Sequence, residues 1–349
     1  MKKVQQNTTR NNSGDLIEIK EGFPDRLSFW AEAYFEFEVT TGEQSRKVQK
    51  RDLGLFVNFL QAKEGRDDRT KWTPRVSQVF KQYLKNGDEI RKPYKDRTVN
   101  RVLAHLKTFS RWIHRLRPFP LGDPMAKMKL LPVGTGLEVE RAITNRERRR
   151  ILDAADFLAV DGSKSKDRNR FKGKDRPQRK NFRGYRNRAI VYVLIETGMR
   201  RAAVTKIDID DVNFKRRVIL VEEKGGLAHA YQISREGIDA IQDYLEHERA
   251  GDFDKWKMPA LFLSAAENHH GNGRLNSRVV NTTWNQVCET AIVDGKTPHS
   301  ARHAMGRHIM EKTGNVAAIQ RQLGHKNATY SLQYARITEK ELDAALNDR

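Results

Sequence analysis

The 349-residue chain has very little cysteine and no long apolar run. Its one cysteine, Cys288, cannot form a disulfide within the chain, and the lack of cysteine pairs removes thiolate zinc sites. No stretch approaches the roughly 18 to 20 apolar residues that a membrane span needs. The polar segment 1–22 also lacks the apolar block of a secretory signal. We therefore expect a soluble, cytoplasmic protein.

Acidic residues are scarce relative to basic ones. Lys and Arg number 66 against 45 Asp and Glu, which gives a net charge of +21 and a pI near 10.0. Such an excess attracts polyanions, because each neutralised phosphate releases condensed counterions. An anionic membrane is the alternative partner, but the sequence shows no amphipathic anchor or lipidation motif. The charge favours nucleic acid as the partner, although it names no activity.

Composition along the chain indicates two domains. The stretch 118–136 has four prolines and three glycines and follows a region in which apolar residues recur at helical spacing. The expected fold class is mainly α with a small β-sheet. The expected parts are, in order, a flexible arm (1–24), a helical domain (25–130), a linker (131–139) and a mixed α/β domain (140–349).

Local signals predict the ends of several elements. Apolar residues on one face mark a long helix over 98–116. Thr73 followed by Pro74 predicts a helix start, and Thr144 with a Glu three residues later has capping-box spacing. The other elements expected in the second domain are strands at 218–222, 230–233 and 261–263, a turn at Gly225-Gly226, and helices from 278 onward.

The segment 163–188 is unusually basic. It holds 12 Lys and Arg against 2 Asp and Glu and has few apolar residues, a composition typical of a disordered loop. The second interpretation is an insertion that contacts phosphates and becomes ordered on DNA, with Lys172 and Lys174 among its contacts. Both interpretations can hold together.

Three short motifs carry the chemistry: TGMRRAAV at 197–204, HSARH at 299–303 and LGHKNATYSLQY at 323–334. Their order and spacing resemble the tyrosine recombinase (phage integrase) family. That family has an Arg after Thr-Gly-x, His-x-x-Arg roughly a hundred residues later, and then Leu-Gly-His followed by a Tyr. It also places a Lys on a β-hairpin between the two arginines. The resemblance assigns the catalytic set to Arg200, Lys224, His299, Arg302, His325 and Tyr334.

The resemblance implies a helical core-binding domain, a mixed catalytic domain, and a site-specific recombinase or integrase that cleaves and rejoins DNA through a 3′-phosphotyrosine. It implies no cofactor, a homo-tetramer on double-stranded DNA with paired half-sites, and a mobile element as source. A C-terminal tail, 337–349, would dock on a neighbouring protomer. Further residues, which are not part of the catalytic set, are expected to contact DNA: Arg101, His105, Arg111 and Arg201. Each of them also has a plainer interpretation as a surface charge.

Phosphodiester cleavage needs these residue types. Attack builds charge on the non-bridging oxygens, and Arg200 and Arg302 each offer a fork of donors to them. Two such cations can replace a metal ion, so none is expected. Tyr334 would attack, with His299 as the proton acceptor. Lys224 would protonate the departing 5′ oxygen, and His325 would donate a hydrogen bond to a phosphate oxygen.

One departure from the family leaves a second class of function open. The family usually has an acidic residue three positions after the first Arg, where this chain has Ala203. A catalytically degenerate relative that binds DNA without cutting it is therefore an alternative. A type IB topoisomerase or a telomere resolvase would share the chemistry. The two-domain size and the spacing from Leu-Gly-His to Tyr favour a recombinase over these.

Single residues have alternatives too. Tyr330 is a second candidate nucleophile, but its spacing from His325 fits the family less well than that of Tyr334. Residues 315–334 also have the caps of a helix-turn-helix, in which Tyr334 would touch DNA without cutting it. His299 and His303 lie four residues apart, a spacing that also suits a metal, although no carboxylate or Cys set accompanies them.

Overall fold

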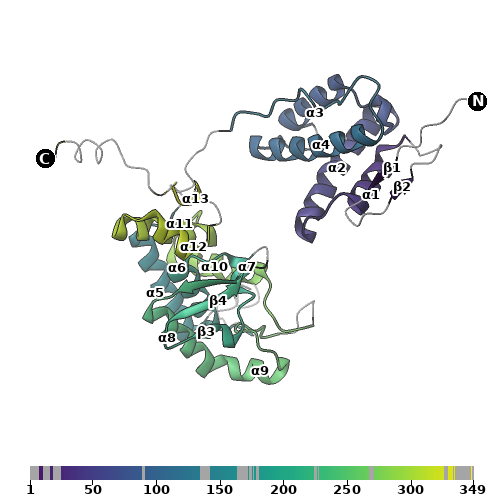
Figure 1. Cartoon of the computed structure of the whole chain (residues 1–349). Coiled ribbons are helices and arrows are strands. Elements are labelled where there is room, and N and C mark those ends of the chain that lie inside the picture. Colours follow the sequence, from purple (N-terminus) through teal and green to yellow (C-terminus); the bar gives the residue numbers. More distant parts are fainter. Residues whose placement is uncertain are drawn as a thin grey trace, which may run out of the picture. The chain divides into compact units, whose positions relative to one another are not determined.

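Helices dominate both halves of the chain in the computed structural model, and the only sheet of more than two strands in the described part has three (Figure 1). Two units separate at residues 135 and 136, inside the stretch expected as the linker. The prediction of a mainly α fold with a small sheet is confirmed. The structure describes residues 8–10, 16–18, 25–88, 91–133, 142–162, 172, 175, 177, 181–223, 226, 228–266, 271–325, 329–332, 334 and 347.

The first unit is a helical domain with an aromatic core. Phe56 packs 4.5 Å from Trp72 and 5.0 Å from Phe80, measured between ring centroids. Each large buried ring contributes a large apolar area to the core of the unit. Its elements are β1 (Thr8–Arg10), β2 (Leu16–Glu18), α1 (Leu27–Phe37), α2 (Glu43–Glu64), η1 (Arg69–Lys71), α3 (Pro74–Asn86) and α4 (Asp96–Leu116).

Two predicted helix starts are confirmed by their caps. The Thr73 hydroxyl accepts the backbone N–H of Val76 at 3.2 Å at the start of α3. Thr144 and Glu147 form a reciprocal capping box at the start of α5. Both caps satisfy backbone N–H groups that have no partner inside the helix, so the local sequence determines where these helices begin.

The second unit packs helices against one face of a short antiparallel sheet with strand order β3-β4-β5, and alternate residues of β4 and β5 face outward. The strand predicted at 230–233 begins earlier, at Ala228. The strand predicted at 261–263 is wrong, since Leu263 makes only an isolated bridge to Arg274. The elements of this unit are α5 (Asn145–Asp161), α6 (Gly184–Thr197), α7 (Arg201–Val204), η3 (Ile209–Asp211), β3 (Val212–Asn213), β4 (Val218–Glu222), β5 (Ala228–Gln232), α8 (Arg235–Tyr244), η4 (Leu245–Arg249), α9 (Ala250–Trp256), α10 (Ser277–Ala291), α11 (Pro298–Thr313), α12 (Val316–Leu323) and α13 (Thr329–Leu332).

Helix α6 is the central element of this unit and is buried along almost its whole length. It packs on α5, α8 and α11. A side chain at Gly184 would lie 2.7 Å from the carbonyl oxygen of Leu158, so only glycine permits this approach to α5. None of the described helices is long and apolar enough to cross a membrane. The contacts of α6 with α5, α8 and α11 account for its burial.

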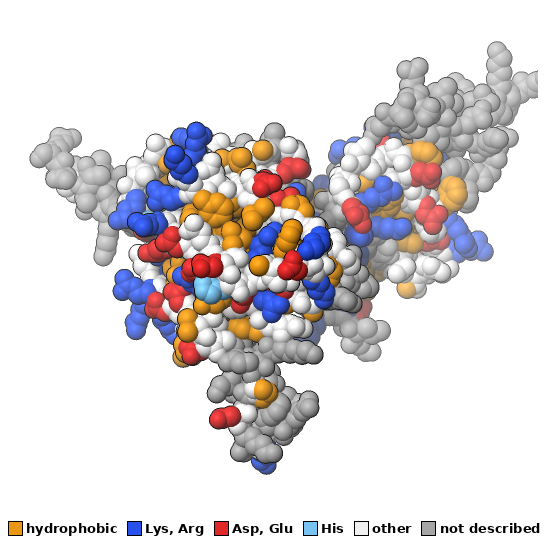
Figure 2. Space-filling model, turned by 90° about the horizontal axis from the view of Figure 1, so that it is seen from below, with side chains coloured by type: hydrophobic (Ala, Val, Ile, Leu, Met, Phe, Trp, Pro, Cys, Tyr) orange, Lys and Arg blue, Asp and Glu red, His pale blue; other side chains and the backbone are white. Residues whose placement is uncertain are grey.

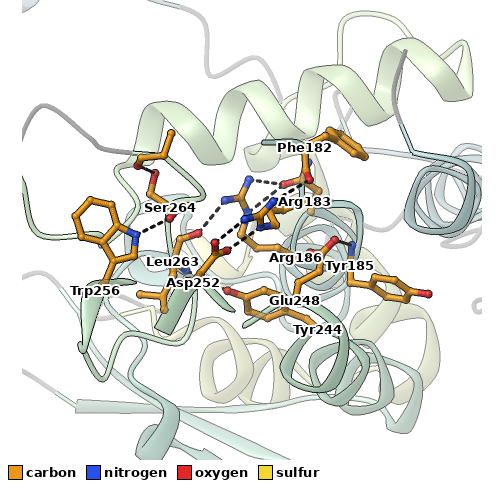
Figure 3. A network of polar contacts seen from close by, with 12 residues as sticks. Phe182, Arg183, Tyr185, Arg186, Tyr244, Glu248, Asp252, Trp256, Leu263 and Ser264 are labelled. Carbon is orange, nitrogen blue, oxygen red and sulfur yellow. Dashed lines mark hydrogen bonds and ion pairs between the residues drawn. The ribbon is translucent and has the colours of Figure 1, made fainter. Parts of the chain in front are cut away.

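Ion pairs fix the start of α6 (Figure 3). Glu248 accepts the backbone N–H groups of Tyr185 and Arg186 at 3.2 and 2.9 Å, and so satisfies two N–H groups of the first helical turn. Arg183 binds both carboxylate oxygens of Asp252, at 2.9 and 2.7 Å. These contacts anchor the helix whose other end leads into the first catalytic motif.

The same contacts correct the interpretation of segment 163–188. Its last part is not a basic loop, because α6 begins at Gly184. Arg186 is buried and donates to the carbonyl of Leu263, and burial lowers its pKa. Arg188 pairs with Asp156 and Asp243. Three of the basic residues counted there therefore have structural partners. Lys172 is exposed, and Lys174 lies outside the described residues.

On the face seen in Figure 2, bulk charge does not single out a site. Figure 2 shows Lys and Arg side chains spread over the visible face among acidic and apolar ones. A dispersed charge attracts nucleic acid without placing it. The position of the site therefore has to come from local geometry.

Candidate active site

The corner between α6 and α7 presents Arg200. Helix α6 ends at Gly198, which has φ +67°, a conformation that favours glycine. A side chain there would also lie 2.7 Å from Cδ2 of Leu323. The chain then turns through the buried Met199 and exposes Arg200 at the start of α7. The Thr-Gly of the first motif therefore serves to turn the backbone so that the arginine faces outward.

A half-buried carboxylate holds Arg200. Nη1 of Arg200 donates to Oε2 of Glu223 at 2.9 Å, and the hydroxyl of Tyr231 donates to Oε1 at 2.5 Å. Burial opposes the charge on Glu223, yet the hydrogen bonds from Tyr231 and Arg200 and the nearby arginine charges hold its pKa below the ordinary value. Burial, and then the bond to Glu223, raise the pKa of Tyr231. The carboxylate therefore stays ionised and the phenol stays protonated.

Arg302 lies inside the unit, on α11, and is only 2% exposed. Its Nη1 donates to the carbonyl of Gly198 at 2.9 Å, and its Nη2 donates to the carbonyl of Leu323. Burial, and then the charge of Arg200, lower the pKa of Arg302. The guanidinium therefore joins the ends of α6 and α12 and lies close enough to Arg200 to feel its charge.

Tyr334 lies against α11, and its hydroxyl is within hydrogen-bond distance of a histidine. The hydroxyl oxygen is 2.9 Å from Nδ1 of His303, and both side chains are buried. The ring occupies the space above Gly306, where an added Cβ would lie 2.6 Å from Cζ of Tyr334. Tyr330, by contrast, is 63% exposed. Of the two candidate nucleophiles, Tyr334 is the one held among the motif residues.

His325 follows the end of α12 and is also buried. Its Nδ1 is 2.8 Å from the hydroxyl of Ser331. Burial, followed by the charges of Arg302 and Arg200, lowers the pKa of His325 to about 4. The imidazole is therefore neutral at pH 7, and its ring lies parallel to that of Tyr334 at a centroid distance of 6.5 Å.

His299 occupies the first turn of α11 and is exposed. Its ring meets that of His303 edge to face, with 4.5 Å between centroids. Together with Arg200 and Arg201 it lines a cavity of about 470 Å³, whose far wall includes Asn281 and Asn285 of α10. A substrate group in this cavity would touch the first arginine and the first histidine of the motifs at once.

The structure thus brings together five of the six residues predicted as catalytic, while Lys224 lies outside the described residues. Sequence reasoning missed two contacts. His303 had been singled out only for its spacing from His299, and Glu223 had no signal at all. Among the described residues no group of three or more His, Cys, Asp or Glu could hold a metal ion.

The residues of α4 expected to contact DNA also have a structural partner. Asp52, buried on α2, accepts both Nε and Nη2 of Arg101, at 2.9 and 3.0 Å, and lies 2.9 Å from Nδ1 of His105. Burial opposes the charge on Asp52, but the bonds from His105 and Arg101 hold its pKa below the ordinary value. Arg111 is exposed and lines a cavity of about 520 Å³ in the same unit.

Comparisons with known proteins point to one family. Residues 176–341 match the model of the phage integrase family. Tyrosine recombinase XerD of Mycobacterium leprae is 29% identical over 162 residues, 45% of this chain and 50% of that protein. XerD of Staphylococcus epidermidis is 22% identical over 296 residues, 82% of this chain and 94% of that protein.

The fold has relatives among solved structures. The XerH site-specific recombinase, solved bound to its difH substrate before cleavage, superposes with a TM-score of 0.64 at 15% identity, covering 91% of this chain and 83% of that one. The solved structures show a shared fold, and the family match places residues 176–341 in the phage integrase, or tyrosine recombinase, family. All six predicted catalytic positions lie within the matched residues 176–341.

Proposed function

We propose that this protein is a site-specific DNA recombinase that cleaves and rejoins DNA through a 3′-phosphotyrosine on Tyr334. The observation that carries the proposal is the hydroxyl of Tyr334 on His303, in a cluster that also holds Arg302 and His325. A phenol is a weak nucleophile, with an ordinary pKa of about 10. A neighbouring base and two arginines are what it needs to attack a phosphodiester.

The roles follow from the contacts. Arg302 uses two of its donors on backbone carbonyls, and since a guanidinium has about five N–H donors, others remain for a phosphate oxygen. Arg200 would bind the same phosphate from the cavity side. The proton of Tyr334 would pass to the histidine pair of α11, of which His303 is the nearer in the described contacts. His325, neutral at pH 7, can donate one hydrogen bond to a phosphate oxygen.

The leaving 5′ oxygen needs a proton, and Lys224 remains our candidate for the acid, by resemblance to the family. The phosphotyrosine conserves the energy of the phosphodiester bond. A 5′-hydroxyl from a second duplex can therefore attack it and rejoin the strand without ATP. The proposed reaction needs no metal ion and no cofactor, because the two arginines provide the positive charge that stabilises the phosphoryl oxygens.

The partners we propose are double-stranded DNA with paired half-sites and three further copies of the chain, assembled as a homo-tetramer. The helical unit would contact DNA through α4, with Arg101, His105 and Arg111. In the second unit Lys172, Lys174 and Arg201 would bind phosphates. The tail 337–349, outside the described residues except for residue 347, would dock on a neighbouring protomer. We further propose a mobile element as the source and the cytoplasm, on the nucleoid, as the site of action.

One observation favours a second candidate function, a relative that binds DNA but has lost its chemistry. Ala203 is 4% exposed and stands where the family usually has a carboxylate. The rest of the set is present, so we rank this candidate, and a topoisomerase or resolvase of the same chemistry, below the recombinase.

Covalent trapping tests the proposal. The protein is incubated with supercoiled DNA that carries the ends of its own element, in the presence of a chelator, and then denatured to reveal protein-linked DNA. We expect an adduct that Tyr334→Phe abolishes and that Tyr330→Phe, at an exposed position four residues away, retains. Tight DNA binding with no adduct from the unaltered protein would instead support the DNA-binding relative.

A further inference from the structure

The first arginine of the site lacks its expected neighbour. Ala203 lies on α7, the short helix that directly follows Arg200, and its methyl group cannot accept a hydrogen bond. Arg200 itself is nearly half exposed on its side chain, at 44%. A free arginine side chain samples many rotamers. A catalytic arginine in this setting needs a fixed acceptor from elsewhere to hold one orientation.

Glu223 provides such an acceptor from a different element. It directly follows β4 and is only 12% exposed on its side chain. One carboxylate oxygen accepts from Arg200 and the other from Tyr231 of β5, which is completely buried. A buried carboxylate is stable only when its oxygens are satisfied. Each oxygen of Glu223 has a donor, so the sheet fixes the carboxylate and the carboxylate fixes the arginine.

Electrostatics point the same way. Arg200 lowers the pKa of Arg302, which shows that the two guanidinium groups repel each other at short range. The charges of Arg200 and Arg302 both act on Glu223 and favour its ionised form. The carboxylate therefore offsets part of the repulsion before any phosphate is bound.

We propose that Glu223 is the positioning residue for Arg200, and that the carboxylate missing at Ala203 has been replaced by one at the end of β4. The inference rests on the proposed function, because it assigns Arg200 to the scissile phosphate. Glu223 acts through Arg200 and need not touch DNA. Its removal should therefore slow bond cleavage more than it weakens DNA binding.

The test compares Glu223→Gln with Glu222→Gln. Glu222 is the neighbouring residue, exposed and of the same charge, so the control removes one carboxylate from the same strand end. The rate of adduct formation is measured in a single turnover at saturating DNA, beside DNA affinity. We expect Glu223→Gln to slow adduct formation roughly tenfold to hundredfold, as for a misplaced catalytic group. Glu222→Gln should stay within about twofold of the unaltered protein.

A double-mutant cycle separates positioning from a general structural role. If Glu223 acts through Arg200, then Glu223→Gln should change the residual rate by less than about twofold in an Arg200→Ala background. Equal slowing in both backgrounds, or a normal rate for Glu223→Gln alone, overturns the inference while leaving the recombinase intact. No adduct from the unaltered protein overturns the proposed function, and this inference with it.

Discussion

Adding one methyl group at Gly306 should separate the chemistry of this protein from its stability. In Gly306→Ala the new Cβ would lie 2.6 Å from Cζ of Tyr334, whereas carbon atoms rest at about 3.5 to 4.0 Å from one another. The ring therefore has to move by about 1 Å, and its hydroxyl then loses the 2.9 Å contact with His303. A displacement of that size in a reacting group costs about a hundredfold in rate.

The expected change in stability is small. Overpacking costs about 1 to 3 kcal/mol, but replacing glycine by alanine inside a helix returns about 1 kcal/mol. Gly306 lies well inside α11, so the free energy of unfolding should fall by no more than about 2 kcal/mol. Gly251→Ala, in α9 with no atom within 4 Å of the added Cβ, is the matched control: it should leave the rate nearly unchanged and raise the free energy of unfolding by up to about 1 kcal/mol.

The assay is single-turnover adduct formation at saturating DNA, beside urea denaturation. We expect Gly306→Ala to bind DNA normally, to unfold near the urea concentration of the unaltered protein, and to form adduct about a hundredfold more slowly. An unchanged rate of adduct formation would refute the reasoning, because it would mean that Tyr334 does not attack from the position that it occupies against α11.

Three further outcomes follow from the same contacts. His303→Gln keeps a polar group but not a base and should slow adduct formation at least about a hundredfold, whereas His308→Ala, exposed on the same helix, should not. The pKa of His325 is depressed to about 4, so the folded state resists its protonation. Stability should be complete above about pH 6.5 and fall towards pH 4, by at most about 3 kcal/mol, with the fall reduced in His325→Gln. Asp52→Asn leaves Arg101 and His105 without their buried carboxylate and should destabilise the first unit by about 2 kcal/mol in urea titration, whereas Glu43→Gln at an exposed pair should give no measurable change.

Sequence predicted best what depends on near neighbours. The starts of α3 and α5 follow from a hydroxyl and the N–H three residues later, and both were predicted correctly. The prediction of a strand at 261–263 failed because an apolar run becomes a strand only when a second strand pairs with it along its length. Within 261–263 only Leu263 forms a bridge, to Arg274. The basic segment 163–188 misled for the same reason, since Arg183 and Arg188 meet acids far away in sequence.

The candidate active site shows the same division between what near neighbours in the sequence predict and what only the fold reveals. Motif spacing identified which residues converge, because the family pattern encodes them. It could not identify Glu223 or His303, whose partners lie 23 and 31 residues away and are brought close only by the fold. An acidic residue at the end of a strand has no distinguishing mark in the sequence. Its role appears only once Arg200 and Tyr231 are seen on either side of it.

The charges of the site match the substrate that we propose for it. Arg200 and Arg302 carry two positive charges, Glu223 carries one negative charge, and His325 is neutral at pH 7. These four groups together leave one positive charge, equal and opposite to that of a phosphodiester. Attack by Tyr334 adds further negative charge to the phosphoryl oxygens, so the arginines bind the transition state more strongly than the bound substrate. Glu223 does not supply this charge; it holds Arg200 in the orientation that meets the phosphoryl oxygens, which is a physical reason for retaining a carboxylate beside an arginine whose task is to bind an anion.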